Sequence, residues 1–162
     1  MPARFPILCF AVSLGACASY DGRGLLPGTA TEAEVRQLMG TPALEIADTD
    51  GTRQLVYPRG PAGVHTFMVH IAPAGRLARI EQVLDEAHFA LVTPDRSTRE
   101  TVTRLLGLPH RTWEFFRTTQ TAWDYRYRDA WGYTADFYVT FSRDGVVVSK
   151  FSQRVGDGDG DR

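Results

Sequence analysis

The chain has 162 residues, with 18 Lys plus Arg, 19 Asp plus Glu and a formal net charge of −1 at pH 7. The hydrophobic fraction of 43% and the aromatic fraction of 11% are typical of a globular protein, and no basic stripe of the kind that binds nucleic acid is present. The charge is divided unevenly, with −3 over residues 29–92 and +3 over residues 93–155. This asymmetry could steer the second half toward an acidic partner or lipid headgroups, or it could reflect interleaved charges on a solvated surface.

Residues 1–16 are predicted to be a targeting segment, outside the fold. A basic residue and an apolar stretch that is too short to span a bilayer lead into small residues and a cysteine, Leu-Gly-Ala-Cys at 14–17. This segment resembles the lipobox of bacterial lipoproteins, in which the signal is removed before the cysteine and the thiol is lipidated. The alternative is an ordinary secretory signal, cleaved nearby, with Cys17 incidental.

Lipidation of Cys17 would leave the mature chain without a thiol, because Cys9 departs with the signal. Ala18, rather than Asp, follows Cys17, and by the sorting rule known for such lipoproteins this favours the outer membrane. Acyl chains on Cys17 would anchor the protein in the outer-membrane lipid, facing the periplasm. Glycines and a proline in residues 17–28 predict a flexible tether between the lipid and the fold.

A twelve-residue pattern occurs twice, at 31–42 and 98–109. The copies share five residue types at the same places: Thr31, Val35, Leu38, Gly40 and Pro42, then Thr98, Val102, Leu105, Gly107 and Pro109. Each copy predicts a short helix with a Thr N-cap, an apolar Val/Leu stripe, a glycine in a left-handed C-cap and a terminating proline. The second helix could instead start at Ser97, with Glu100 completing a capping box. A period near 70 residues indicates a duplicated small domain.

Short strands are predicted after the first helix, at 43–47, 54–57, 66–71 and 76–83, with a hairpin signal at Asp50-Gly51. Residues 66–71 alternate, so that Phe67, Val69 and Ile71 lie on one face and Met68 and His70 on the other. The unit is therefore expected to be a helix packed on an antiparallel meander.

A linking helix capped by Asp85 is predicted next, and the strands of the first unit then recur. Residues 55–57 match 123–125, residues 67–71 match 137–141, and the turn glycine Gly75 matches Gly145. The predicted fold class is α+β, a tandem duplication of units at 29–84 and 85–155. The Gly/Asp segment 156–162 is predicted to be a disordered tail.

The capped helix ending in Leu-x-Gly-x-Pro, the strand ending in Leu/Trp-x-Tyr, the aromatic-rich strand and the turn glycine together resemble the SmpA/OmlA (BamE) outer-membrane lipoprotein domain, here in two tandem copies. The resemblance implies a non-enzymatic accessory protein of β-barrel assembly, with envelope proteins such as barrel-assembly components as partners. Val35, Gly40, Pro42, Val102, Gly107 and Pro109 carry over as fold residues. The tandem fold is also similar to the β-lactamase inhibitor protein, so a periplasmic inhibitor or ligand-binding module is the alternative.

Catalytic, metal-binding and cofactor-binding residues are not predicted. The histidines His65, His70, His88 and His110 lack metal-ligand spacing, and the Asp85/His88 pair is interpreted as a helix cap beside a surface residue.

Aromatic residues concentrate in the second unit and suggest a partner surface. Alternation places Trp123, Tyr125 and Tyr127 on one strand face and Asp124, Arg126 and Arg128 on the other. The Trp123 row is expected to be core beneath the Val102/Leu105 helix, which leaves the charged row for a partner. Exposed Tyr, Trp and Arg are enriched at binding hot spots. The predicted partner-binding residues are Trp113, Arg126, Arg128, Trp131 and Tyr133, with the aromatics in loops.

Overall fold

The structure is a computed structural model that describes residues 19–60 and 63–156. Helix α1 (Glu32–Met39) precedes a first sheet of order β1-β2-β3-β4, made of Leu44–Ala47, Arg53–Arg59, His65–Ile71 and Leu77–Gln82. Helices α2 (Glu86–Leu91) and α3 (Arg99–Leu106) precede a second sheet of order β5-β6-β7-β8, made of Arg111–Phe115, Gln120–Arg128, Thr134–Phe141 and Val147–Arg154. All strand pairs are antiparallel. The predicted α+β class, with two antiparallel sheets that each carry short helices, is confirmed.

Several predicted features lie outside the described residues. These are the targeting segment 1–16, the candidate lipidation site Cys17, and residues 157–162 of the Gly/Asp segment.

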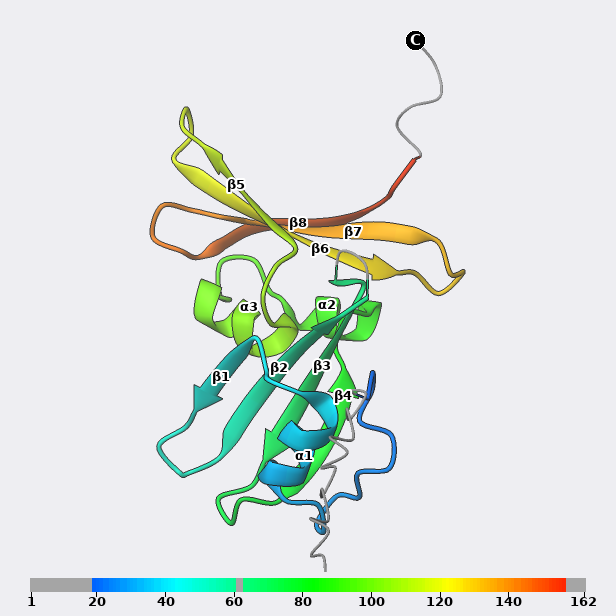
Figure 1. The fold of residues 1–162 in the computed structure, drawn as a ribbon. Helices are drawn as coiled ribbons and strands as arrows, with labels where there is room; N and C mark the ends of the chain where they lie inside the picture. The colour runs from blue at the N-terminus through cyan, green and yellow to red at the C-terminus, as the bar shows by residue number, and fades with distance from the viewer. Residues whose placement is uncertain (1–18, 61–62, 157–162) are drawn as a thin grey trace, which may run out of the picture.

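The elements form four layers (Figure 1). Helix α1 covers one face of the first sheet, and α2 and α3 lie between the two sheets. Val35 and Met39 of α1 share a core with Leu55 and Tyr57 of β2. On the opposite face, Val56 and Met68 belong to the core that also contains α2, α3 and the second sheet. The alternation predicted for residues 66–71 is correct, but both faces of the first sheet are buried, because the second unit covers the face that carries Met68.

The two repeated helices begin where the shared pattern places them. The Thr31 hydroxyl accepts a hydrogen bond from the Glu34 backbone N–H, and the Glu34 carboxylate accepts one from the Thr31 N–H, which completes a capping box and lowers the pKa of Glu34. Helix α3 is capped by Thr98, whose hydroxyl accepts from the Thr101 N–H at 3.2 Å. The alternative start at Ser97 is wrong, because that hydroxyl accepts from the Thr93 N–H instead.

The apolar stripe of each helix differs by one position from the prediction. The fully buried pairs are Val35 with Met39 and Val102 with Leu106, whereas Leu38 and Leu105 are only partly buried. An i, i+4 pair lies on one helix face as well as an i, i+3 pair does, so the repeat pattern alone could not choose between them.

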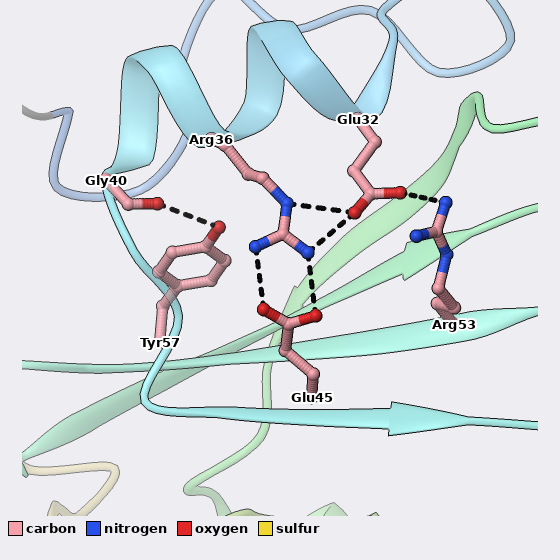
Figure 2. Close-up of polar contacts among 6 residues, drawn as sticks. All are labelled: Glu32, Arg36, Gly40, Glu45, Arg53 and Tyr57. Carbon is pink, nitrogen blue, oxygen red and sulfur yellow. Dashed lines mark hydrogen bonds and ion pairs between the residues drawn. The ribbon is translucent and has the colours of Figure 1, made fainter.

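Glycines end both helices, in a conformation that differs from the predicted one. Gly40 has φ 84° and ψ −161°, and Gly107 has φ 80° and ψ −152°, outside the left-handed helical region and in a region that is essentially restricted to glycine. A strand tyrosine holds each helix end: the Tyr57 hydroxyl donates to the Gly40 carbonyl (Figure 2), and the Tyr125 hydroxyl donates to the Gly107 carbonyl, both at 3.2 Å. The duplication therefore extends to the hydrogen bond that joins helix and sheet.

The strands of the two units also have the same register. A cross-strand row in the first sheet, the first-sheet row, runs Leu44, Val56, Met68, Glu81. The corresponding second-sheet row runs Arg111, Asp124, Tyr138, Phe151. Both sheets show a register shift at the last residue of their third strand, between His70 and Ile71 and between Thr140 and Phe141. Each position of one sheet therefore has a defined counterpart in the other.

An ion-pair network ties α1 to its sheet (Figure 2). The Arg36 guanidinium donates to Glu32 at 2.9 Å and to Glu45 at 2.7 Å, and Arg53 pairs with the second oxygen of Glu32. The hydrogen bond from Arg36 lowers the pKa of Glu45. Because these groups are partly exposed, each pair is expected to contribute at most about 1 kcal/mol.

Residues 19–28, for which the sequence predicts a tether, lie against the first unit. The Ser19 N–H donates to the Leu38 carbonyl at 2.5 Å, and the Gly28 N–H donates to the Leu77 carbonyl at 2.7 Å. The Tyr20 ring packs edge-on against Phe67, with centroids 5.9 Å apart. The described chain is therefore held to α1 and β4 from its first residue.

Candidate functional site: the open face of the second sheet

The two faces of the second sheet have different environments. On the inner face, Tyr125 and Tyr127 are buried against α2 and α3, and Trp123 packs edge-on against Phe141 at 4.7 Å. This confirms the interpretation of the Trp123 row as core. On the outer face, no helix of the described residues covers the strands (Figure 1).

We call this outer surface the open face. The strand pairing directs to it the side chains of Arg111, Trp113, Phe115, Asp124, Arg126, Asp136, Tyr138 and Phe151. Three of its aromatic residues are about half exposed: Trp113 at 47%, Phe115 at 50% and Phe151 at 53%. These aromatics lie on the two edge strands, β5 and β8, of an uncovered sheet face, and exposed apolar side chains on such a face are typical of an interaction surface.

Two buried carboxylates lie among these aromatics. Asp136 accepts two hydrogen bonds from one edge of the Arg126 guanidinium, with Nε–Oδ1 at 2.8 Å and Nη2–Oδ2 at 3.0 Å. The hydrogen bond to Asp136 raises the pKa of Arg126. Tyr138 stacks on Phe151 at 4.9 Å, and burial, assisted by the charge of Asp136, raises the pKa of Tyr138. Asp136 is thus a satisfied structural anion.

Asp124 lacks such a partner. Its side chain is 2% exposed, and Oδ2 lies 3.9 Å from Nε of Arg111, too far for a hydrogen bond. Its Oδ1 is buried and accepts no hydrogen bond from any described residue. A buried acceptor left without a donor costs about 1–3 kcal/mol, and more when the group is charged. The open face therefore contains one unmet, charged hydrogen-bond acceptor.

A second exposed aromatic pair lies in the turn between β6 and β7. Trp131 is 81% exposed and Tyr133 is 59% exposed, and the backbone N–H of each donates to Oδ1 of Asp129 at 2.9 Å. Arg154 binds Oδ2 of Asp129 at 2.7 Å and lies over the Tyr133 ring at 4.6 Å. These contacts to Asp129 fix the turn from which the exposed Trp131 side chain projects.

The predicted partner-binding residues separate into two groups. Trp113 lies in β5, not in a loop, and shares the open face with Arg126. Arg128, which donates to the Gly132 carbonyl at 3.0 Å, belongs with Trp131 and Tyr133 at the β6–β7 turn. Trp113 pairs with Ala122 near the other end of β6, so the groups are about 20 Å apart along the strand, at roughly 3.3 Å per residue.

Six residues of the open face were missing from the predicted set: Arg111, Phe115, Asp124, Asp136, Tyr138 and Phe151. Asp124 was placed on the charged row, but nothing in the sequence distinguishes a satisfied carboxylate from an unsatisfied one. Strict alternation along β8 would have placed Phe151 in the core with Val147, but the register shift opposite Thr140 and Phe141 turns Phe151 to the open face.

Other features of the described chain offer little chemistry. Over residues 19–60 and 63–156, no group of three or more His, Cys, Asp or Glu side chains could hold a metal ion. His88 and Asp85 form the expected cap, with the His88 N–H 2.9 Å from Oδ1 of Asp85. Within the same ranges, no helix has the length and apolar character needed to cross a membrane.

Comparison with known proteins identifies one domain. Residues 81–150 match the family model for the outer membrane protein assembly factor BamE domain. Proteins of this family are non-catalytic outer-membrane lipoproteins, and the domain suggests a role in outer-membrane protein assembly. The match detects a single copy, which spans α2, α3 and most of the second sheet.

No curated protein matches the chain. Among solved structures, the chain is similar to a DUF4309 family protein (YjgB) from Bacillus subtilis, with 14% identity, a TM-score of 0.32, and coverage of 82% of this chain and 83% of that chain.

Proposed function

We propose that this chain is a non-enzymatic accessory protein of outer-membrane protein assembly, which acts through protein–protein contacts. One observation carries the proposal: the part of the chain that matches the BamE domain, residues 81–150, also contains most of the open face. Trp, Tyr and Arg side chains, the residue types that dominate binding hot spots, are exposed there and at the adjoining β6–β7 turn.

The second part of the proposal concerns location. Lipidation of Cys17 would hold the chain in the outer membrane at its periplasmic face, where barrel-assembly components and their client proteins are accessible. The lipobox-like residues 14–17 and the match to a family of outer-membrane lipoproteins support this location.

Affinity purification from envelopes tests both parts. The full chain should fractionate with the outer membrane and retain barrel-assembly components, whereas Cys17→Ala should release it into the soluble periplasmic fraction. If both forms are soluble, the anchored role is refuted. Recovery of a soluble hydrolase that binds both forms equally would favour the inhibitor alternative.

A further inference from the structure

The face of the first sheet that carries Val56 is occupied by the second unit. Val56 and Met68 of the first-sheet row are fully buried in a core shared with Val102 and Leu106 of the repeated helix α3. The Gln54 side chain donates to the Arg104 carbonyl at 2.7 Å, which fixes the position of α3 on this face. This side of the first sheet is therefore the docking surface for the helices of the following unit.

The open face is the counterpart of that docking surface. The shared register aligns Leu44 with Arg111, Val56 with Asp124, Met68 with Tyr138 and Glu81 with Phe151. Among the described residues no helix layer covers this face (Figure 1), and the apolar centre of the row is replaced by a carboxylate flanked by an arginine and aromatic rings. The strand register is the same in the two sheets, but the centre of the row is apolar in the first sheet (Val56, Met68) and polar in the second (Asp124, Tyr138).

We propose that the open face docks a partner protein that places a lysine or arginine side chain against Asp124, between apolar contacts to Trp113 and Phe151. This inference rests on the proposed protein-binding function and adds the surface and the chemistry of the partner. The partner lies on the second sheet as α2 and α3 lie on the first.

A cationic group is favoured by comparing the two buried carboxylates of the same face. Asp136 has its arginine, Arg126, in a two-point contact. In contrast, Oδ1 of Asp124 has no donor among the described residues, and Arg111 stays 3.9 Å from Oδ2. A lysine or arginine would supply the missing charge-assisted hydrogen bond once exposed side chains at the carboxylate, such as Arg111, move aside on docking. The exposed ring of Trp113 can contact the same cation or its aliphatic stem.

Anionic ligands fit this surface poorly. The Arg126 guanidinium is already bound to Asp136, and Asp124 would repel a phosphate or a lipid headgroup that approached Arg111. The half-exposed aromatics of the open face, Trp113 on the strand next to Asp124 and Phe151 two strands away, are consistent with a protein partner that buries them.

The test uses the full-length chain in envelope membranes, with a photoreactive benzoylphenylalanine in place of Phe151. The variants are Asp124→Asn, Asp124→Val, which introduces the residue found at position 56, and Asp144→Asn, which removes a charge from the exposed β7–β8 turn. The cross-linked peptide should contain Lys or Arg next to the linked residue. Its yield should fall at least about tenfold in both Asp124 variants and stay unchanged in Asp144→Asn.

Thermal unfolding of the same variants separates binding from folding. Asp124→Val should melt at the wild-type temperature or above it. The wild-type carboxylate is a buried charge with an unmet hydrogen bond, and valine removes both. Charge exchange completes the test: Asp124→Arg should abolish the cross-link, and Asp or Glu at the partner's basic position should restore it.

Three results would overturn the docking surface: a yield that is insensitive to Asp124, a cross-link only to lipid or to another copy of this chain, or a loss that follows a lowered melting temperature. Retention of barrel-assembly components by Asp124→Val would refute this inference and leave the proposed function intact. A basic peptide from a protein outside barrel assembly would support the docking surface and refute the proposed partner class.

Discussion

Replacing Gly107 with alanine tests how the second unit docks on the first sheet. Gly107 combines φ 80° with ψ −152°, and a Cβ built on it would lie 2.7 Å from Cγ1 of Val56 and 3.0 Å from Cγ2 of Thr66. Alanine at this position therefore meets both a strained backbone and a fully packed neighbour. The two contributions can be estimated separately.

The backbone conformation alone costs a side-chain-bearing residue about 1–3 kcal/mol. Forcing an extra methyl group into a packed core typically costs a further ~1–3 kcal/mol. We therefore expect Gly107→Ala to lower the free energy of unfolding by about 4 kcal/mol, and the melting temperature by roughly 8–16 °C for a chain of this size.

Urea unfolding of the Cys17→Ala chain, followed by tryptophan fluorescence, measures this loss. Gly75→Ala is the matched control, because Gly75 has φ 73° and nothing within 4 Å of the built Cβ, so only the backbone cost applies. Adding Val56→Ala to Gly107→Ala should recover part of the steric cost, with a coupling energy of about 1 kcal/mol or more. Equal losses for the two glycine variants, together with no coupling to Val56, would refute this account of the docking.

Three further predictions concern single side chains. Tyr125→Phe removes the hydrogen bond to the Gly107 carbonyl and should cost about 1 kcal/mol. Burial also raises the pKa of Tyr125 well above its ordinary value of 10.0. The residue should therefore favour the folded state below pH 10 and lose that contribution as the pH rises above 10. The melting temperature of Tyr125→Phe should accordingly fall less at alkaline pH than that of the wild type. Burial, reinforced by the charge of Arg79, lowers the pKa of His70 below 6.5 in spite of its hydrogen bond to Glu81. The folded state therefore favours the neutral ring, stability is lost as the pH falls below 6.5, and His70→Gln should flatten the melting temperature between about pH 7 and pH 5. Trp131→Ala should change the free energy of unfolding by less than about 0.5 kcal/mol, because surface substitutions rarely do more. It should nevertheless reduce co-purification with the partner. A loss of binding that accompanies unfolding would count against a direct contact.

Local sequence patterns predicted the elements of each unit well. The Thr31 and Thr98 caps, the Asp85 cap and the alternation in β3 depend on residues within a few positions of one another. The duplication then predicted the second unit from the first, because loops change length while strands keep their register.

Long-range relations were outside the reach of those patterns. Alternation shows that Met68 and Val69 lie on opposite faces, but it cannot show that the second unit covers the face of Met68. Aromatic composition indicated a surface in the second unit, yet it grouped Trp113 with Trp131, which the paired length of β6 keeps apart. The unmet acceptor on Asp124 depends on distances to Arg111 that no spacing rule supplies.

The docking of residues 19–28 has a consequence for how an anchored chain could work. A single residue separates Cys17 from Ser19, and Ser19 is already bound to the last turn of α1. The first sheet, the α2–α3 layer and the second sheet lie beyond α1 (Figure 1) and place the open face about 30 Å away, at roughly 10 Å per layer. A lipid on Cys17 would therefore attach the folded units to the membrane without a flexible linker between them. A bound partner would be held at a set distance from the acyl chains, and lengthening the segment between Cys17 and Ser19 would be the direct way to change it.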